Sequence, residues 1–204
     1  DDAAVLPVDD VSRIVISTDA LVEGVHFFGE EEVDLIAQKS LRTNLSDMAA
    51  MGATPWVYTL SLSLGPVIKG TLDQWLTSFV KGLKKDQDKY DVGLVGGDTV
   101  TGSGPTMISI TILGRADPRG VITRNGASVY DDIYVSGTIG DSAAGLKIIK
   151  EPVNYLTDSD QLYLKCRYYL PDPRVKLGQA LVGVASAAMD ISDGLIQDLG
   201  HLCS

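Results

Sequence analysis

Short stretches of alternating or uniformly apolar residues predict four β-strands in the first half of the chain. Residues 13–17 predict a strand that ends at Thr18-Asp19. Alternation over residues 56–64 and 107–113 predicts two strands with one face of each toward the core. Residues 92–95 predict a further strand, which ends just before Gly96-Gly97-Asp98-Thr99. Asp19 and Asp98 are therefore expected at strand ends.

Two amphipathic helices are predicted between these strands. One covers residues 32–51, and its apolar arc at helical spacing consists of Ala37, Leu41, Leu45 and Met48. The other opens with a capping box formed by Thr71 and Gln74. A polar row beside the first arc contains Ser40, Thr43, Asn44 and Asp47. Because aspartate is a poor residue for a helix interior, we expect Asp47 to lie at the wall of a site, not in open solvent.

The mixed order of these elements indicates an α+β domain over residues 1–118, followed by an incomplete α/β domain over residues 119–204. In the second domain we expect a strand at 133–136, followed by helices over about 141–150 and 177–187. A short extended run at 189–192 then leads into a helix that begins near Leu195. Since that helix looks unfinished, we expect the domain to continue beyond Ser204.

Composition and charge narrow the function. The 204 residues are 45% hydrophobic and 22% charged, which is typical of a globular protein. The 17 lysines and arginines against 27 aspartates and glutamates give a net charge of −10, which argues against a nucleic acid or an anionic membrane as partner. No apolar run approaches the roughly 20 residues of a membrane span, and no signal segment opens the chain. We therefore expect a cytoplasmic protein. The two cysteines and two histidines make a disulfide framework or a zinc site improbable.

Aspartates at predicted element ends are the most informative chemical feature: Asp1, Asp2, Asp19, Asp47, Asp98, Asp190 and Asp193. Ligands usually bind at the carboxyl ends of strands in α/β sheets, and free N–H groups where a strand meets a helix can receive phosphate oxygens. Taken singly, each aspartate can also be a cap, a turn or a solvated end. If they converge, they need a divalent cation, and hard oxygen donors select Mg²⁺, Mn²⁺ or Ca²⁺. The sequence contains no P-loop.

Several motifs occur together in a characteristic order. They are Ser17-Thr18-Asp19, VEGVHF at residues 22–27, NLSDMAAMGA at 44–53, GGDT at 96–99 and DISDGL at 190–195. In this combination the chain resembles the thiamine-monophosphate kinases, a family of the PurM-like ATP-dependent superfamily. The resemblance covers essentially the whole chain, whereas any one motif alone would indicate only the superfamily.

The resemblance implies a PurM-like two-domain architecture whose mixed-sheet N-terminal domain forms a homodimer. It implies transfer of the γ-phosphoryl group of ATP to thiamine monophosphate, giving thiamine diphosphate, with several Mg²⁺ ions as cofactors. The implied metal ligands are Asp2, Ser17, Thr18, Asp19, Asp47, Asp98, Asp190 and Asp193. Asp47, Asp98 and Asp193 are the implied catalytic residues. Gly97, Asp98, Arg124 and Ser192 resemble ATP contacts, and His26 resembles a substrate contact.

The residue chemistry is compatible with this reaction. A phosphate acceptor is already ionised near neutral pH, so a chain poor in histidine needs no strong general base. Like charges about 4 Å apart repel by about 4 kcal/mol at an effective dielectric constant of 20, so cations must bridge the reactants and the aspartates. We expect direct in-line transfer without a phospho-enzyme. The alternatives are another ATP-using PurM-like enzyme, a non-catalytic module that binds metal or nucleotide, and an acidic scaffold. The chain stops before a Gly-Gly-Glu-Asp segment of the implied thiamine-binding half.

Overall fold

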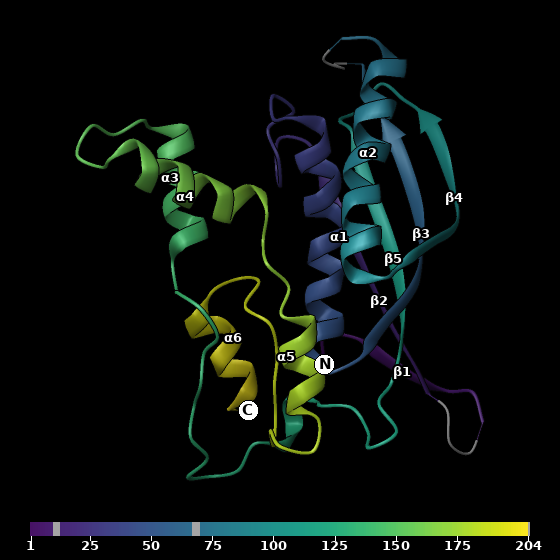
Figure 1. The fold of residues 1–204 in the computed structure, drawn as a ribbon, viewed down its shortest axis with the longest axis vertical. Coiled ribbons are helices and arrows are strands. Elements are labelled where there is room, and N and C mark those ends of the chain that lie inside the picture. The colour runs from purple at the N-terminus through teal and green to yellow at the C-terminus, as the bar shows by residue number, and fades with distance from the viewer. Residues whose placement is uncertain (10–12, 67–69, 204) are drawn as a thin grey trace.

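The computed structural model describes residues 1–9, 13–66 and 70–203. A five-stranded mixed sheet has the order β1-β2-β5-β3-β4 (Figure 1). Its strands are β1 (Ala4–Pro7), β2 (Arg13–Val22), β3 (Thr54–Leu64), β4 (Gly93–Thr101) and β5 (Met107–Arg115). Neighbours pair antiparallel except β3 and β4, which pair parallel. Helices α1 (Val33–Ala50) and α2 (Leu72–Tyr90) lie together on one face of this sheet.

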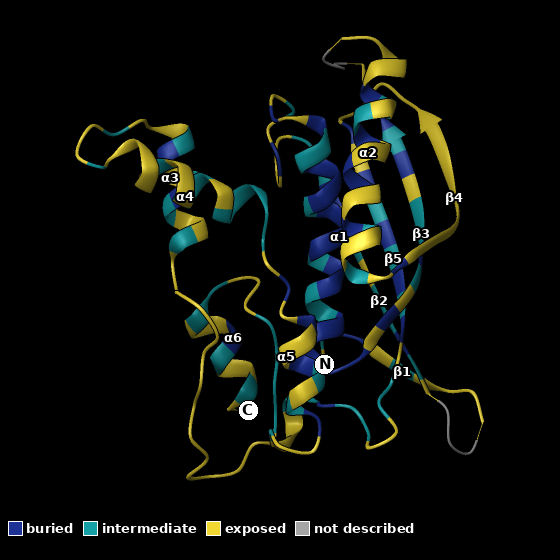
Figure 2. Ribbon diagram, viewed as in Figure 1, coloured by how far each residue is buried: buried dark blue, intermediate teal, exposed yellow. Residues whose placement is uncertain are grey.

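The core lies between the sheet and α1. Ile108, Ile110 and Ile112 of β5 point to the helix side and are at most 1% exposed, as the alternation of that strand requires. On α1 the residues of the predicted apolar arc, Leu41, Leu45 and Met48 among them, are fully buried. All nine residues of β4 are exposed, so one edge of the sheet is open to solvent (Figure 2).

The second half of the chain is helical in the residues that the structure describes. It contains a 3-10 turn (Arg124–Gly126) and helices α3 (Asp141–Lys150), α4 (Asp158–Tyr169), α5 (Val175–Leu181) and α6 (Leu195–Leu202). Helix α5 packs on α1 so closely that a Cβ atom on Gly178 would lie 1.9 Å from the carbonyl oxygen of Ala49. A glycine is therefore required where the two backbones touch.

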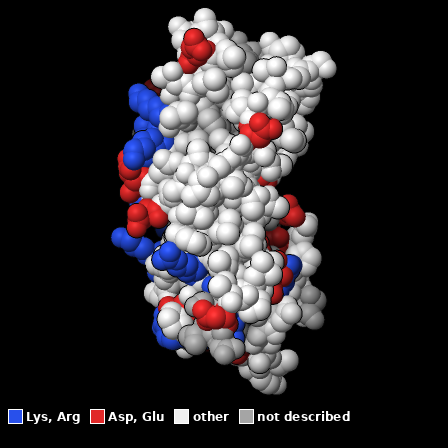
Figure 3. Space-filling model, turned by 90° about the vertical axis from the view of Figure 1, so that its right-hand side faces the viewer, with Lys and Arg blue, Asp and Glu red and all other residues white. Residues whose placement is uncertain are grey.

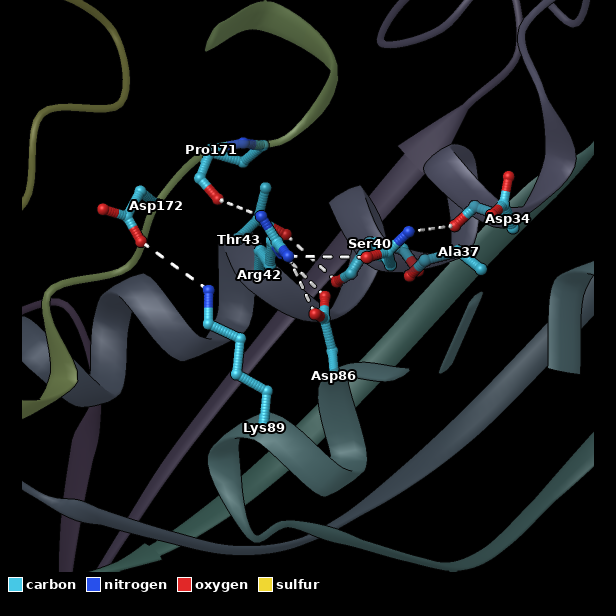
Figure 4. Close-up of polar contacts among 10 residues, drawn as sticks. Asp34, Ala37, Ser40, Arg42, Thr43, Asp86, Lys89, Pro171 and Asp172 are labelled. Atoms are coloured by element: carbon cyan, nitrogen blue, oxygen red, sulfur yellow. Dashed lines mark hydrogen bonds and ion pairs between the residues drawn. The ribbon is translucent and has the colours of Figure 1, made fainter. Parts of the chain in front are cut away.

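A buried ion pair joins α1, α2 and the connector between α4 and α5 (Figure 4). The guanidinium of Arg42 donates from Nε and Nη2 to the two carboxylate oxygens of Asp86, at 2.7 and 2.9 Å. Its Nη1 donates to the carbonyl oxygen of Pro171 at 3.1 Å. The side chains of Arg42 and Asp86 are 10% and 1% exposed. The bidentate pair thus fastens α1 to α2, and the remaining donor of Arg42 ties the connector of the second half to α1.

The predicted helices of the first half are confirmed, but two strands extend beyond their predicted ends. β2 continues through Asp19 to Val22, and β4 continues through Asp98 to Thr101. Both aspartates lie inside strands because neighbouring strands pair with them, Asp19 with Ile110 and Asp98 with Ser61. The expectation that these aspartates end their strands is therefore wrong.

The strand predictions in the second half are also wrong. Residues 133–136 and 189–192 form no strand, since the described residues of this half offer no strand with which they could pair. Tyr134 is 86% exposed. The helix predicted to end at 187 ends at Leu181, shortly before Gly183, whose φ is +77°. Helix α4 was not predicted. None of the described helices is long and apolar enough to cross a membrane.

Candidate functional site

Four carboxylates that are far apart in the sequence gather beside the N-terminal domain's central helix. Asp47 lies on α1, Asp19 on β2, Asp190 in the segment before α6, and Asp2 just before β1. Burial raises the pKa of Asp47 to about 8 against a hydrogen bond from Ser17, and the nearby charges of Asp19, Asp190 and Asp2 raise it further. The four groups therefore lie within one another's electrostatic field.

The alternation of β2 explains how two of the predicted residues meet α1. Ser17 and Asp19 point to the same side of the strand as the buried Val15, toward α1. The hydroxyl of Ser17 donates to Oδ2 of Asp47 at 2.5 Å. Burial raises the pKa of Asp19, against a hydrogen bond from the side chain of Thr43, which lies one helical turn before Asp47. The helix and the strand thus build one polar wall.

Thr18 points to the opposite face of β2. Its Oγ1 donates to the carbonyl oxygen of Ile110 at 3.1 Å and lies 2.9 Å from Oγ1 of Thr111. Its side chain is therefore turned away from the four carboxylates.

Asp190 and Asp2 complete the cluster from the other side. Burial raises the pKa of Asp190, against a hydrogen bond from Ser46, and the charge of Asp19 raises it further. Burial also raises the pKa of Asp2; the charge of Asp190 adds to this effect and that of Arg124 opposes it. Oδ2 of Asp2 is buried and lacks a hydrogen-bond partner in the described part of the chain.

Arg124 is fastened beside this cluster. Its backbone N–H donates to Oδ1 of Asp1 at 3.0 Å, and its Nη2 donates to the carbonyl oxygen of Asp1 at 2.9 Å. These bonds hold the segment that carries Asp2.

Gly97 and Asp98 lie on the far edge of the sheet. Two strands, β5 and β3, separate β4 from β2, which corresponds to about 14 Å between β2 and β4 at the usual strand spacing. The carboxylate of Asp98 is exposed and accepts a hydrogen bond from the backbone of Thr99 at 2.8 Å. A Cβ atom on Gly97 would lie 1.9 Å from the carbonyl oxygen of Leu60, so this position requires glycine for close strand packing. The structure does not bring these two residues to the four carboxylates.

Ser192 and Asp193 lie in the segment that follows Asp190, but their groups point elsewhere. Oδ2 of Asp193 accepts a hydrogen bond from Gln197 at 3.0 Å. The backbone N–H groups of Ser192 and Asp193 both donate to Oδ2 of Asp198. The N–H groups expected to be free for phosphate are therefore already bonded.

His26 borders a cavity of about 280 Å³ that adjoins Asp19 through Thr43. Nδ1 of His26 accepts a hydrogen bond from the backbone of Val22 at 3.0 Å, so the proton of the neutral ring is on Nε2. Nζ of Lys39 donates to the carbonyl oxygen of His26 at 2.8 Å and lies 3.7 Å from the centre of the Tyr168 ring. Burial lowers the pKa of Lys39 to about 8. Phe27 and Phe28 also line the cavity, so three aromatic side chains lie beside the ammonium groups of Lys39 and Lys150.

The chemistry of the four carboxylates fits a hard divalent cation. Gathered negative charge and the unpartnered oxygen of Asp2 both favour a cation. No three His, Cys, Asp or Glu side chains of the described residues are arranged to hold one ion by themselves. Mg²⁺ is usually held by one or two carboxylates together with water and substrate phosphates, so it does not need such a cage. The site therefore fits Mg²⁺ bound jointly with a phosphate substrate.

Three contributors were not predicted from the sequence: Ser46, Asp198 and Tyr168. Ser46 lies one residue before Asp47, and its side chain reaches Asp190. Asp198 is buried against the segment that carries Ser192. The only local signal for Asp198 is an acidic residue in the first turn of a helix, which is common in any protein.

A family model described as AIR synthase related protein, N-terminal domain, matches residues 1–116, more than half of the chain. The chain belongs to the AIR synthase related family. This membership confirms the predicted PurM-like fold.

Proteins similar in sequence to this chain include two bacterial thiamine-monophosphate kinases. The protein of Haemophilus influenzae is 43% identical over 99% of this chain and 60% of its own length. The protein of Caulobacter vibrioides is 45% identical over 99% of this chain and 55% of its own length. The chain thus spans about 60% of the length of such relatives.

Solved structures of the AIR synthase related fold agree closely with this one. A structure described as AaThiL complexed with AMPPCP and TMP has a TM-score of 0.90 and 31% identity, over 99% of this chain and 63% of that one. The thiamine-monophosphate kinase of Stenotrophomonas maltophilia has a TM-score of 0.86 and 39% identity, over 99% of this chain and 63% of that one. Escherichia coli HypE, a hydrogenase maturation protein, has a TM-score of 0.70 and 21% identity over 93% of this chain and 56% of that one, which shows the shared fold alone.

Proposed function

We propose that the complete protein is a thiamine-monophosphate kinase, which transfers the γ-phosphoryl group of ATP to thiamine monophosphate and releases thiamine diphosphate. The observation that carries the proposal is that Asp2, Asp19 and Asp190 lie near enough to Asp47 for their charges to raise its pKa. Two negatively charged phosphates can react beside such a cluster only when cations offset the charge. The names of the relatives, and the nucleotide analogue and TMP in a related structure, agree with this reaction.

The four aspartates and the hydroxyl of Ser17 would hold several Mg²⁺ ions between them, together with water and the substrate phosphates. Bound Mg²⁺ would supply the positive charge that offsets the phosphates of both substrates. Ser17 fixes the carboxylate of Asp47 by its hydrogen bond. Because Thr43, Ser46 and Asp47 all lie on the rigid helix α1, their relative positions are also fixed. Arg124, fastened beside Asp2, is positioned to pair with phosphate oxygens of ATP through its remaining N–H groups. The roles of Thr18, Gly97, Asp98, Ser192 and Asp193 rest on the motifs alone.

The cavity beside His26 is our proposed acceptor pocket. Nε2–H of His26 is free to donate because Nδ1 already accepts from Val22. The aromatic side chains of Phe27, Phe28 and Tyr168 suit the ring system of thiamine monophosphate. The acceptor oxygen is ionised near neutral pH, so no residue of the chain has to remove a proton. We therefore propose direct in-line transfer.

Product analysis tests this function. The complete protein, given ATP, thiamine monophosphate and Mg²⁺, should form thiamine diphosphate, and excess chelator should abolish the product because the four carboxylates then repel both substrates. Chromatography of the thiamine phosphates measures this directly. Undiminished product in chelator would contradict the metal scheme. Tight binding of Mg²⁺ and ATP without transfer would instead favour the non-catalytic module, and transfer to a different acceptor would favour another enzyme of the superfamily.

We also propose that two copies meet through the side of the sheet that carries β4. Leu94, Val95 and Val100 of β4 are 45 to 62% exposed, and charged side chains lie mainly at the margins of this side (Figure 3). Apolar surface of this kind is typical of an interface. Sedimentation equilibrium of the complete protein should give a dimer, and Val95→Lys should shift it toward the monomer. A monomer at micromolar concentration would contradict the proposal.

We also propose that the protein acts in the cytoplasm.

A further inference from the structure

Asp198 is a buried carboxylate that the proposed chemistry does not use directly. It lies in the first turn of α6 and is only 3% exposed. Its Oδ2 accepts hydrogen bonds from three consecutive backbone N–H groups, those of Ser192 at 3.0 Å, Asp193 at 3.2 Å and Gly194 at 3.1 Å. A single carboxylate oxygen thus fills a small anion-binding concavity made by residues 192–194.

The concavity depends on both the glycine and the carboxylate. Gly194 has a φ of +137°, a conformation that other residues rarely adopt, and this turns the chain directly after its N–H into α6, whose first turn carries Asp198. Three N–H groups that converge on one point repel one another unless an acceptor lies there. Asp198 supplies that acceptor from within the chain, so the segment has its shape before any substrate binds.

The segment that Asp198 holds also carries a member of the carboxylate cluster. Asp190 lies two residues before Ser192, its side chain is bonded by Ser46, and its backbone is bonded to Asp2. A change in the shape of residues 192–194 therefore moves the point at which Asp190 enters the cluster. No contact of Asp198 with Asp47 or with the cavity beside His26 is present among the described residues.

We propose that Asp198 is a positioning residue: its carboxylate occupies the place of a phosphate oxygen on residues 192–194 and thereby fixes Asp190 in the cluster. This inference rests on the proposed function. It assigns the three N–H groups to an internal carboxylate, and it leaves only the side chain of Ser192 for a nucleotide. Residues that orient metal ligands in this way typically change metal affinity or activity by about 10–100-fold when replaced.

Three variants of the complete protein test the inference: Asp198→Ala, Asp198→Asn and Asp73→Ala. Asp73 is the matched control, since it is an exposed aspartate in the first turn of α2. Asp198→Ala should weaken the binding of Mn²⁺ alone and lower kcat by about 10–100-fold. Asp198→Asn keeps one acceptor oxygen and should lose less. Asp73→Ala should match the unaltered protein.

Chemical rescue separates positioning from a general loss of stability. Sodium formate should restore part of the Mn²⁺ affinity and of kcat to Asp198→Ala, because its carboxylate can occupy the vacated place between the N–H groups. It should not restore Asp190→Ala, which lacks the ligand itself. If Asp198→Ala does not fold, Asp198→Asn must still show weaker Mn²⁺ binding with an unchanged circular dichroism spectrum.

The failure of this inference is distinguishable from the failure of the proposed function. Unaltered Mn²⁺ affinity and kcat in the Asp198 variants, or a loss that formate does not restore in folded Asp198→Ala, would overturn the positioning role while the unaltered protein still forms thiamine diphosphate. If the unaltered protein forms no product, the proposed kinase function fails, and Mn²⁺ affinity alone then decides the role of Asp198.

Discussion

Asp47→Asn should lower the rate of thiamine diphosphate formation by about 100-fold or more, the usual loss when one group that offsets charge in a transition state is removed. Asp47 is the member of the cluster whose charge interacts with those of Asp19, Asp190 and Asp2 together. Asparagine has almost the same shape but carries no negative charge and is a weaker ligand for Mg²⁺. Steady-state kinetics with saturating Mg²⁺, ATP and thiamine monophosphate measure the loss. Turnover near that of the unaltered protein would refute the role.

The stability of the same variant supplies the control. Burial raises the pKa of Asp47 in the folded state from its usual 3.8 to about 8. Between these values the folded state holds a proton that the unfolded state has released, so the free energy of unfolding falls as pH rises from about 4 to about 8. In chelator, thermal melting should show this fall in the unaltered protein and a smaller one in Asp47→Asn. If Asp47→Asn melts at a much lower temperature than the unaltered protein at pH 7, its inactivity is due to misfolding.

Arg42→Ala should cost about 3–5 kcal/mol of the free energy of unfolding, because it leaves the charge of Asp86 buried without its partner. Asp86 is 1% exposed, and both of its oxygens accept from Arg42. The change also removes the hydrogen bond from Arg42 to the carbonyl oxygen of Pro171, which holds the connector between α4 and α5 on α1. Urea denaturation followed by circular dichroism measures the cost. A loss below about 1 kcal/mol would show that the pair is solvated.

Two further variants make the Arg42 result specific. Lys85→Ala breaks the ion pair between Lys85 and Asp34, whose side chains are 48% and 21% exposed, and should cost at most about 1 kcal/mol. The double variant Arg42→Met with Asp86→Leu removes both buried charges together and should be far less harmful than Arg42→Ala, since apolar pairs of similar volume often replace buried ion pairs without loss.

Sequence patterns correctly predicted those helices and strands whose stability depends on residues close together in the chain. The capping box at Thr71 and Gln74 is formed as predicted, with both of its hydrogen bonds present. The alternation of β5 gave its buried face, since its isoleucines pack on α1. By contrast, the apolar residues of α4 are spread around the helix and none of them is buried, so α4 shows only a weak form of the apolar arc by which a helix is predicted.

Pairing across the sheet and between domains was not predictable in this way. The strand through Asp19 continues because β5 pairs with it, and the strand through Asp98 continues because β3 pairs with it. The residues next to either aspartate in the sequence do not indicate which strand will pair there. Ser17 and Asp47 are 30 residues apart, and their hydrogen bond depends on how α1 lies across β2. The motifs singled out the segments that carry these aspartates, but only the fold showed that the charges of Asp2, Asp19 and Asp190 act on Asp47 and that Asp98 lies on the far edge.

The touching backbones of Gly178 and Ala49 have a practical consequence for protein engineering. At this contact the approach of α5 to α1 is limited by main-chain atoms and not by side chains. A chimera that joins residues 1–118 to the second half of another member of the family must therefore keep a glycine at the position of Gly178. A graft with a larger residue there would hold α5 farther from α1.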